Sequence, residues 1–240
     1  MAEYLIFQLY GPMTAWGDIA VGEYRPSFAH PSKSAIIGLF AAALGIRRDE
    51  EERQKALADA CIFAVRVDAM GTLLRDYHTA QVPPRKKGVT RHTRYTELVS
   101  EDLNTILSSR DYRCDAVYTV GVGLRDGSQF TLQNLAQKLR KPEFTLYLGR
   151  KSCPLALPLN PKIVETATFK EALNKISLSP HLLPLVTQTT HVGVYWDDGI
   201  TSGYEKDHVH VIIRRDVPLS RKRWQFSERR EHYASVGREG

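Results

Sequence analysis

Residues 31–45 read PSKSAIIGLFAAALG, and this stretch decides how the fold begins because it predicts a helix with one apolar face. Ser32 is a residue type that caps helix N-termini, and Gly45 is the type that ends helices in a left-handed conformation. The apolar residues between them recur at helical spacing: Ile36, Leu39, Phe40, Ala43 and Leu44. A charged stretch at residues 49–53 (DEEER) predicts the opening of a second, short surface helix.

Segments rich in β-forming residues lie on both sides of this helical region. Residues 4–10 (YLIFQLY) predict a strand that Gly11-Pro12 ends, and residues 61–68 (CIFAVRVD) predict a second strand. The chain therefore opens as strand, helix and strand.

Three more elements complete the first part of the chain. Residues 111–124 predict a third strand, residues 131–140 an amphipathic helix limited by Pro142, and residues 144–148 a short fourth strand. The order βαββαβ is that of ferredoxin-like domains, which include the RRM, where one sheet face lies open to RNA. We therefore expect an α+β, ferredoxin-like (RRM-like) domain over residues 1–150.

Two features lie outside that pattern. Roughly 40 residues separate the second and third strands, far more than an ordinary connection, and this predicts an inserted arm. After residue 150, prolines punctuate short segments, and residues 185–196 and 208–215 read as two strands around the turn signal Asp197-Asp198-Gly199. Residues 151–240 are thus expected to form a smaller, β-rich unit.

The composition is that of an ordinary soluble globular protein, with 42% hydrophobic and 25% charged residues in 240. No apolar run reaches the ~18 residues that span a bilayer, and the first residues lack a signal-peptide pattern, so we expect a cytoplasmic protein without a membrane partner. Three widely spaced cysteines, Cys61, Cys114 and Cys153, favour reduced thiols. Metal-ligand spacings and a P-loop are missing, which predicts neither a metal nor another cofactor.

The net charge of +6 is unevenly distributed along the chain. Residues 85–94 carry five cations and no acid: Arg85, Lys86, Lys87, Arg91 and Arg94. Residues 214–240 hold eight Lys or Arg against four Asp or Glu, so the remainder of the chain sums to 6 − 5 − 4 = −3. Solvated loops are one explanation for each basic run. Together with an RRM-like fold, the two runs favour nucleic-acid binding.

The start of the main helix is a candidate anion site. Free backbone N–H groups at the helix N-terminus, the hydroxyls of Ser32 and Ser34 and the ammonium of Lys33 suit a phosphate. Helix capping alone is the alternative explanation.

Residues 76–79 (DYHT) lie at the base of the expected arm. Tyr77 and His78 are able to stack on a base and bond to a sugar. The same pair, beside lysines, is what a metal-independent ribonuclease uses, with His78 deprotonating a 2′-hydroxyl and a cation stabilising the phosphorane. A third interpretation is that His78 only pairs with Asp76.

Residues 147–154 (YLGRKSCP) combine an aromatic ring, a glycine, two cations and a hydroxyl at the expected end of a strand. These properties are typical of RNA contacts, because glycine allows a close backbone approach and the cations meet phosphates. The candidate RNA-binding residues are Tyr147, Gly149, Arg150, Lys151 and Ser152. Near the first strand, Trp16 offers either a stacking platform or a packing anchor, and packing is favoured.

Four sequence blocks, in this order, resemble the CasD family of type I-E CRISPR Cascade subunits, within the RAMP superfamily. They are GPMTAWG at residues 11–17, PSKSAIIGL running on to Leu44-Gly45-Ile46, RDYHT at residues 75–79 and YLGRKSCP at residues 147–154. Asp115-Ala116 also fits the family, and the resemblance covers about residues 4–160.

The resemblance implies a ferredoxin-like domain with a β-hairpin thumb, here at about residues 80–112. It implies a non-catalytic subunit of the Cascade surveillance complex that caps the 5′ handle of the CRISPR RNA (crRNA) and helps assemble the complex for target DNA recognition. The implied partners are the crRNA handle, the backbone subunit CasC, the large subunit CasA and, through the assembled complex, target DNA. A related type I-C branch cleaves repeat RNA, so the resemblance keeps an endoribonuclease acting through Tyr77, His78 and Lys33 as the alternative.

Overall fold

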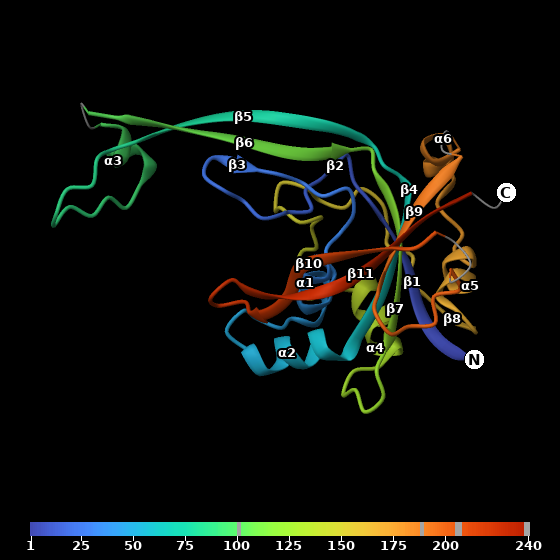
Figure 1. Ribbon diagram of the computed structural model, residues 1–240. Coiled ribbons are helices and arrows are strands. Elements are labelled where there is room, and N and C mark those ends of the chain that lie inside the picture. Colours follow the sequence, from blue (N-terminus) through green and yellow to red (C-terminus); the bar gives the residue numbers. More distant parts are fainter. Residues whose placement is uncertain (100–101, 188–189, 205–207, 238–240) are drawn as a thin grey trace.

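The computed structural model describes residues 1–99, 102–187, 190–204 and 208–237. Its centre is a seven-stranded antiparallel sheet in the order β10-β11-β9-β4-β7-β1-β8, shown in Figure 1. The bounds of its strands are β1 Ala2–Tyr10, β4 Cys61–Ala69, β7 Val117–Leu124, β8 Lys162–Thr166, β9 His191–Asp197, β10 His210–Ser220 and β11 Gln225–Gly237. The strands expected at residues 4–10 and 61–68 are confirmed as β1 and β4.

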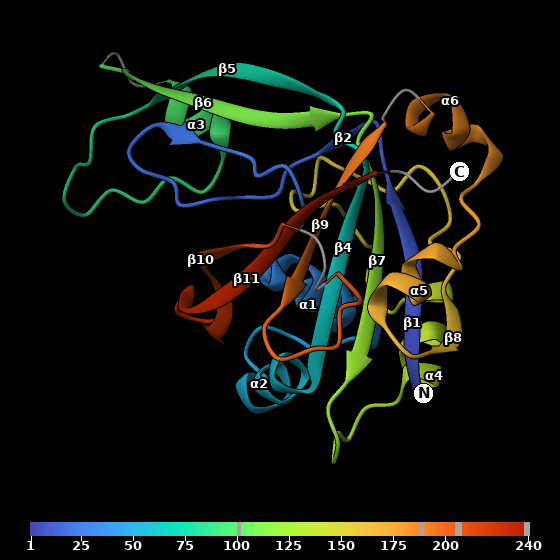
Figure 2. The ribbon, with the colours of Figure 1, turned by 45° about the vertical axis from the view of Figure 1, so that its right-hand side comes forward.

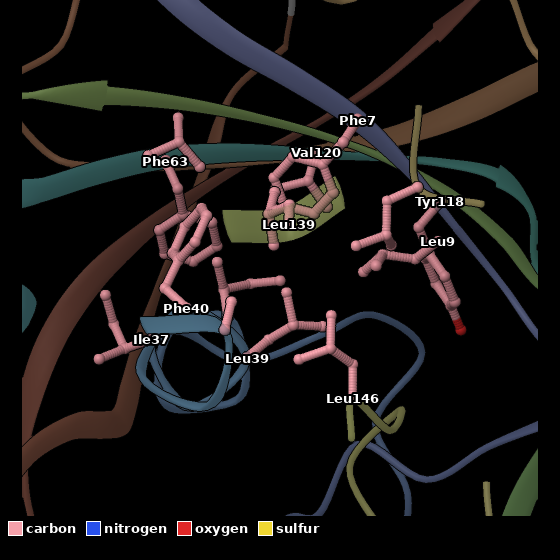
Figure 3. Close-up of a cluster of buried hydrophobic side chains, with 14 of the residues drawn as sticks. Phe7, Leu9, Ile37, Leu39, Phe40, Phe63, Tyr118, Val120, Leu139 and Leu146 are labelled. Carbon is pink, nitrogen blue, oxygen red and sulfur yellow. The ribbon is translucent and has the colours of Figure 1, made fainter. Parts of the chain in front are cut away.

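Helices cover both faces of this sheet. Helices α1 (Lys33–Leu44) and α4 (Leu132–Arg140) contribute to the core on one face, which Figure 3 shows around Phe7, Phe40 and Phe63. Helix α5 (Phe169–Asn174) packs on the other face through Phe169, against Tyr4. The alternation of apolar side chains along β1 supplies both layers, because successive residues of a strand point to opposite faces.

The expected ends of α1 are confirmed. The Ser32 hydroxyl accepts a hydrogen bond from the N–H of Ala35, and Gly45 ends the helix at φ 75°. The predicted second helix is α2 (Glu51–Ala60), and the predicted amphipathic helix is α4, capped by the side chain of Thr131.

The fourth strand is not where the sequence predicts it. Residues 144–148 form no strand. The strand that pairs with β1 on the side away from β7 is β8. The backbone amides of Glu143 and Phe144 donate to carbonyls at the end of α1, and Leu148 donates to Cys153 across a tight turn. These amides are therefore engaged elsewhere and do not enter the sheet.

The expected insertion forms a long arm, defined here as residues 72–114, which projects from the body (Figure 1). Strands β5 (Thr72–Val82) and β6 (Asn104–Cys114) pair antiparallel along their whole length, and α3 (Arg94–Leu98) lies between them in sequence. Short strands β2 (Met13–Thr14) and β3 (Tyr24–Arg25) pair with β6 near the body.

The single strand expected over residues 111–124 is wrong. The chain breaks between β6 and β7, where Asp115 adopts φ 56°. The arm also begins at Thr72, earlier than the predicted residue 80, because Gly71 at φ 64° turns the chain out of β4. A Cβ at Gly71 would lie 2.2 Å from the carbonyl oxygen of Cys114, so only glycine fits this close crossing at the arm root.

The last part of the chain joins the same sheet. Strand β9 pairs with β4 on one side and β11 on the other, and the tight hairpin is β10-β11 (Figure 2). The prediction of a hairpin around Asp197-Asp198-Gly199 is therefore wrong, because β11 lies between the two strands that this turn was expected to join. Before β9, the chain forms the short helices η1 (Pro180–Leu182) and α6 (Leu183–Val186). The division of the chain into two units at residue 150 remains a prediction. Strands from both sides of that residue belong to one sheet.

A buried ion network ties these C-terminal strands to the start of α1. Arg229 binds Asp216, Asp197 and Glu231, and all four side chains are at least nine-tenths buried. The Lys33 ammonium lies 2.9 Å from Asp197, and Arg214 lies 3.3 Å from Glu231. Three cations thus face three carboxylates, and the charges that the sequence presents as a basic stretch are partly internal.

Among the described residues, no helix is long and apolar enough to cross a membrane.

Candidate nucleic-acid interface

The arm carries an exposed basic loop between β5 and α3. Arg85, Lys86 and Lys87 are exposed on it, and Arg91 is partly exposed. Arg94 is the first residue of α3 and binds Glu97 at 2.7 Å and the carbonyl of Gln81. Four of the five predicted arm cations are therefore presented on the loop, whereas Arg94 also fastens α3 to β5.

The arm root, where β5 and β6 join the body, is held together by a cluster of polar side chains that is separate from the buried ion network. Arg75 of β5 lies 2.8 Å from Asp111 of β6, and the hydroxyl of Tyr24 donates to the same carboxylate. The hydrogen bond from Arg75 is the main reason that the pKa of Asp111 is lowered, so this carboxylate stays charged. Because Tyr24 comes from β3, the cluster couples the arm to the loop that begins at Gly17.

A tight turn lies beside this root, and we call residues 147–154 the basic turn. Tyr147 bridges to Pro154, and the Leu148 amide donates to Cys153 at 2.8 Å. Gly149 adopts φ 86°, and a Cβ there would lie 1.9 Å from the carbonyl oxygen of Ala15. The close approach at Gly149 is to the protein's own backbone, and a contact of Gly149 with RNA stays a prediction.

Within the basic turn, the predicted contact residues separate into two groups. Arg150 donates to the carbonyls of Asp111 and Arg25, and its guanidinium lies 4.7 Å from the ring centre of Tyr112. Lys151 and Ser152 are exposed, and Tyr147 is half-buried. Arg150 therefore fastens the turn to the arm root, while Lys151 and Ser152 face solvent at the same place.

Tyr77 and His78 lie on β5, close to the arm root. Tyr77 is 63% exposed, which leaves its ring open to a ligand. His78 pairs with Asp76 at 2.9 Å, as the third interpretation of this motif expects. Both side chains thus lie on a strand that is exposed to solvent.

The start of α1 differs most from its prediction. Lys33 is only 7% exposed, and the carboxylate of Asp216 accepts from its backbone N–H at 2.8 Å. A carboxylate of the chain thus takes the position predicted for a phosphate, and Ser32 and Ser34 bond to each other. Lys33 belongs to the buried network, and so the catalytic set of Tyr77, His78 and Lys33 is not assembled.

Sequence reasoning missed several residues at the arm root: Tyr24, Arg25, Asp111 and Tyr112. Their segments lie far apart in the chain, and only the pairing of β3 with β6 brings them together. The packing role favoured for Trp16 is confirmed, because its ring is buried edge-on against Tyr118. In the described part of the chain, no group of His, Cys, Asp or Glu side chains is arranged to hold a metal ion.

Comparisons with known proteins agree with this architecture. The family model described as CRISPR-associated protein (Cas_Cas5) matches residues 4–232. The chain is 38% identical to the CRISPR system Cascade subunit CasD of Escherichia coli (strain K12), over 99% of this chain and 97% of that protein. In class, then, the chain is a CRISPR-associated protein.

The chain belongs to the Cas5 family of these proteins, and the resemblance to CasD seen in the sequence is confirmed. Two solved structures share the mixed α/β fold. One, described as a CRISPR RNA-guided surveillance complex, has a TM-score of 0.65 at 24% identity and covers 98% of this chain and 89% of its own. The other, described as the crystal structure of a Cas protein, has a TM-score of 0.61 at 25% identity and covers 98% of this chain and 95% of its own.

Proposed function

We propose that this protein is a non-catalytic, RNA-binding subunit of a type I-E CRISPR Cascade complex, in which it caps the 5′ handle of the crRNA. The name of its 38% identical relative supports membership in Cascade. One observation on the chain itself carries the RNA-binding role. The exposed Lys151 of the basic turn adjoins the root of the arm, and the basic loop lies at the far end of the same arm (Figure 1), so two separate segments offer phosphate contacts along it.

In this proposal the body is a ferredoxin-like domain. The central strands β8-β1-β7-β4, with α1 and α4 on one face, support this assignment because they follow the βαββαβ order. The arm is then the thumb, and its basic loop follows the RNA near the handle. CasC, CasA and, through the complex, target DNA are the proposed partners.

Lys151 provides the cleanest test of RNA binding by the basic turn. Replacing Lys151 by alanine removes an exposed charge, and we expect about a tenfold loss of affinity for handle-containing RNA at low salt, with a shallower salt dependence. Fluorescence anisotropy of the full chain with labelled crRNA measures both quantities. Lys141→Ala is the matched control, because Lys141 is an exposed lysine at the end of α4. Equal affinities for the two variants would remove the basic turn from the RNA site.

We also propose that the protein does not cut RNA. The burial of Lys33 in an ion pair supports this, since it takes away the cation that His78 needs for a metal-independent ribonuclease. Incubation of the purified protein with repeat RNA in EDTA is expected to leave the RNA intact. Specific cleavage that His78→Ala abolishes would establish the endoribonuclease instead.

A further inference from the structure

The basic C-terminal stretch, residues 214–240, is a third concentration of positive charge, separate from the arm and the basic turn. Two of its arginines, Arg214 and Arg229, are buried in the ion network. Exposed cations remain at the end of the β10-β11 hairpin, where Arg221, Lys222, Arg223 and Trp224 form the turn. We call residues 221–224 the hairpin tip.

Trp224 is the unusual residue of the hairpin tip. Its side chain is 57% exposed, although a tryptophan is ordinarily well buried. Its backbone adopts φ 52°, a left-handed conformation that glycine and asparagine favour and that is strained for a bulky residue. Strain of this kind is retained at functional sites more than elsewhere, so the position calls for a reason to keep an indole.

The indole ring is held ready for a planar ligand. The guanidinium of Arg48 lies 4.9 Å from its centre, a cation–π contact that fixes the orientation of the ring. Lys222 and Arg223 directly precede Trp224 in the turn and are exposed, so the turn that carries the ring also presents two cations to solvent. An oriented aromatic ring next to cations is the arrangement that binds single-stranded nucleic acid.

Arg221 anchors the hairpin tip to the body. It donates to the carbonyl of Ser34 in α1, and it lies against Gly38, where a Cβ would be 3.3 Å from the guanidinium. Burial and the charge of Arg48 lower the pKa of Arg221 to about 10, while Tyr147 favours its charged form. Arg221 is therefore still a cation at neutral pH, and its hydrogen bond to Ser34 holds the hairpin tip against the start of α1.

Acidic residues near the hairpin tip have partners of their own. Glu51 accepts a hydrogen bond from Ser220, and Glu50 accepts from Arg53 and from the backbone N–H of Arg47. Glu50 is thus paired at the start of α2, whereas the carboxylate of Glu51 lies against Ser220, just before the tip. The exposed cations of the tip are left to meet phosphates.

We propose that the hairpin tip is a second contact for single-stranded RNA, in which a base stacks on Trp224 and Lys222 and Arg223 bind the adjoining phosphates. This inference rests on the proposed function, because it adds a second contact for the RNA that the basic turn is proposed to bind. The ligand is the same crRNA, bound by stacking and by charge and without base-specific hydrogen bonds.

Trp224→Asn tests the stacking contact. Asparagine tolerates the left-handed backbone, so this variant removes the ring without straining the turn. We expect about a tenfold loss of affinity for fluorescein-labelled crRNA with its repeat-derived 5′ end, measured by anisotropy on the full chain. Trp224→Phe keeps an aromatic face and should lose less than threefold. Leu219→Asn, which removes an equally exposed apolar side chain from the same hairpin, is the matched control and should bind as the wild type does.

The outcomes separate the two proposals. If Lys151→Ala weakens binding and Trp224→Asn does not, the hairpin tip is not an RNA contact and the proposed function stands. The same conclusion follows if Trp224→Asn leaves RNA affinity intact but releases a protein subunit from the assembled complex. If the wild-type chain does not bind the crRNA at all, both proposals fail. Thermal melting of each variant checks that a lost affinity is not a lost fold.

Discussion

Arg229→Ala is expected to lower the melting temperature by roughly 6 to 20 °C. Removing one partner of a buried ion pair costs about 3–5 kcal/mol, and each kcal/mol shifts the melting temperature of a chain of this size by about 2–4 °C. Arg229 binds Asp216 at 2.6 Å and Asp197 at 3.0 Å, and it also binds Glu231. Without it, the three buried carboxylates keep Lys33, Arg214 and the imidazole of His30 as side-chain partners.

Arg230→Ala is the matched control for this change. Arg230 is the next residue of β11, and its side chain is exposed on the opposite side of the strand. Its loss should change the free energy of unfolding by less than about 0.5 kcal/mol. Circular dichroism melting of both variants measures the difference. A shift for Arg229→Ala no larger than that for Arg230→Ala would mean that the network does not hold the C-terminal strands to α1.

Gly149→Ala is the second change with a large expected effect. Its Cβ would lie 1.9 Å from the Ala15 carbonyl oxygen, a backbone atom that no side-chain rotation moves away. The two loops must therefore separate, which threatens the 3.0 Å hydrogen bond from the Ala15 amide to Leu148. Overpacking costs about 1–3 kcal/mol and the left-handed backbone costs about 1–2 kcal/mol more. We expect roughly 2–5 kcal/mol of destabilisation, measured by urea unfolding.

Gly127→Ala separates the two contributions to that cost. Gly127 has φ 76°, but a Cβ there meets nothing within 4 Å. Only the backbone strain of about 1–2 kcal/mol then applies. Equal losses for Gly127→Ala and Gly149→Ala would show that the basic turn does not pack against the Ala15 loop as described. A larger loss at Gly149, together with weaker crRNA binding, is the expected result.

Local patterns in the sequence predicted the elements of the first part of the fold. The cap at Ser32, the stop at Gly45 and the apolar spacing of α1 depend on neighbouring residues, and each is confirmed. The fourth strand was misplaced because residues 144–148 have the composition of a strand, while their amides bond to the end of α1 and across a turn. Those partners are distant in sequence, and composition alone does not reveal them.

In the candidate site, too, features that depend on neighbouring residues were predicted, and features that depend on residues distant in the sequence were not. The arm cations and Lys151 are exposed, as a solvated basic run predicts. Lys33 is not, because its partners Asp197 and Asp216 lie more than 150 residues away, at 164 and 183 positions along the chain. The role of Arg150 as a bridge to Asp111 and Arg25 was not predicted either, because it depends on the pairing of β3 with β6.

We propose above that this chain holds the 5′ handle of the crRNA within a Cascade complex. The most direct measurement is photo-crosslinking of a crRNA carrying 4-thiouridine in its 5′ handle, in the complex purified after co-expression with the neighbouring genes. Mass spectrometry then identifies the crosslinked peptide. We predict crosslinks to this chain within the basic turn and the arm. Crosslinks from the handle only to other subunits, or a crRNA-loaded complex that lacks this chain, would contradict the proposal.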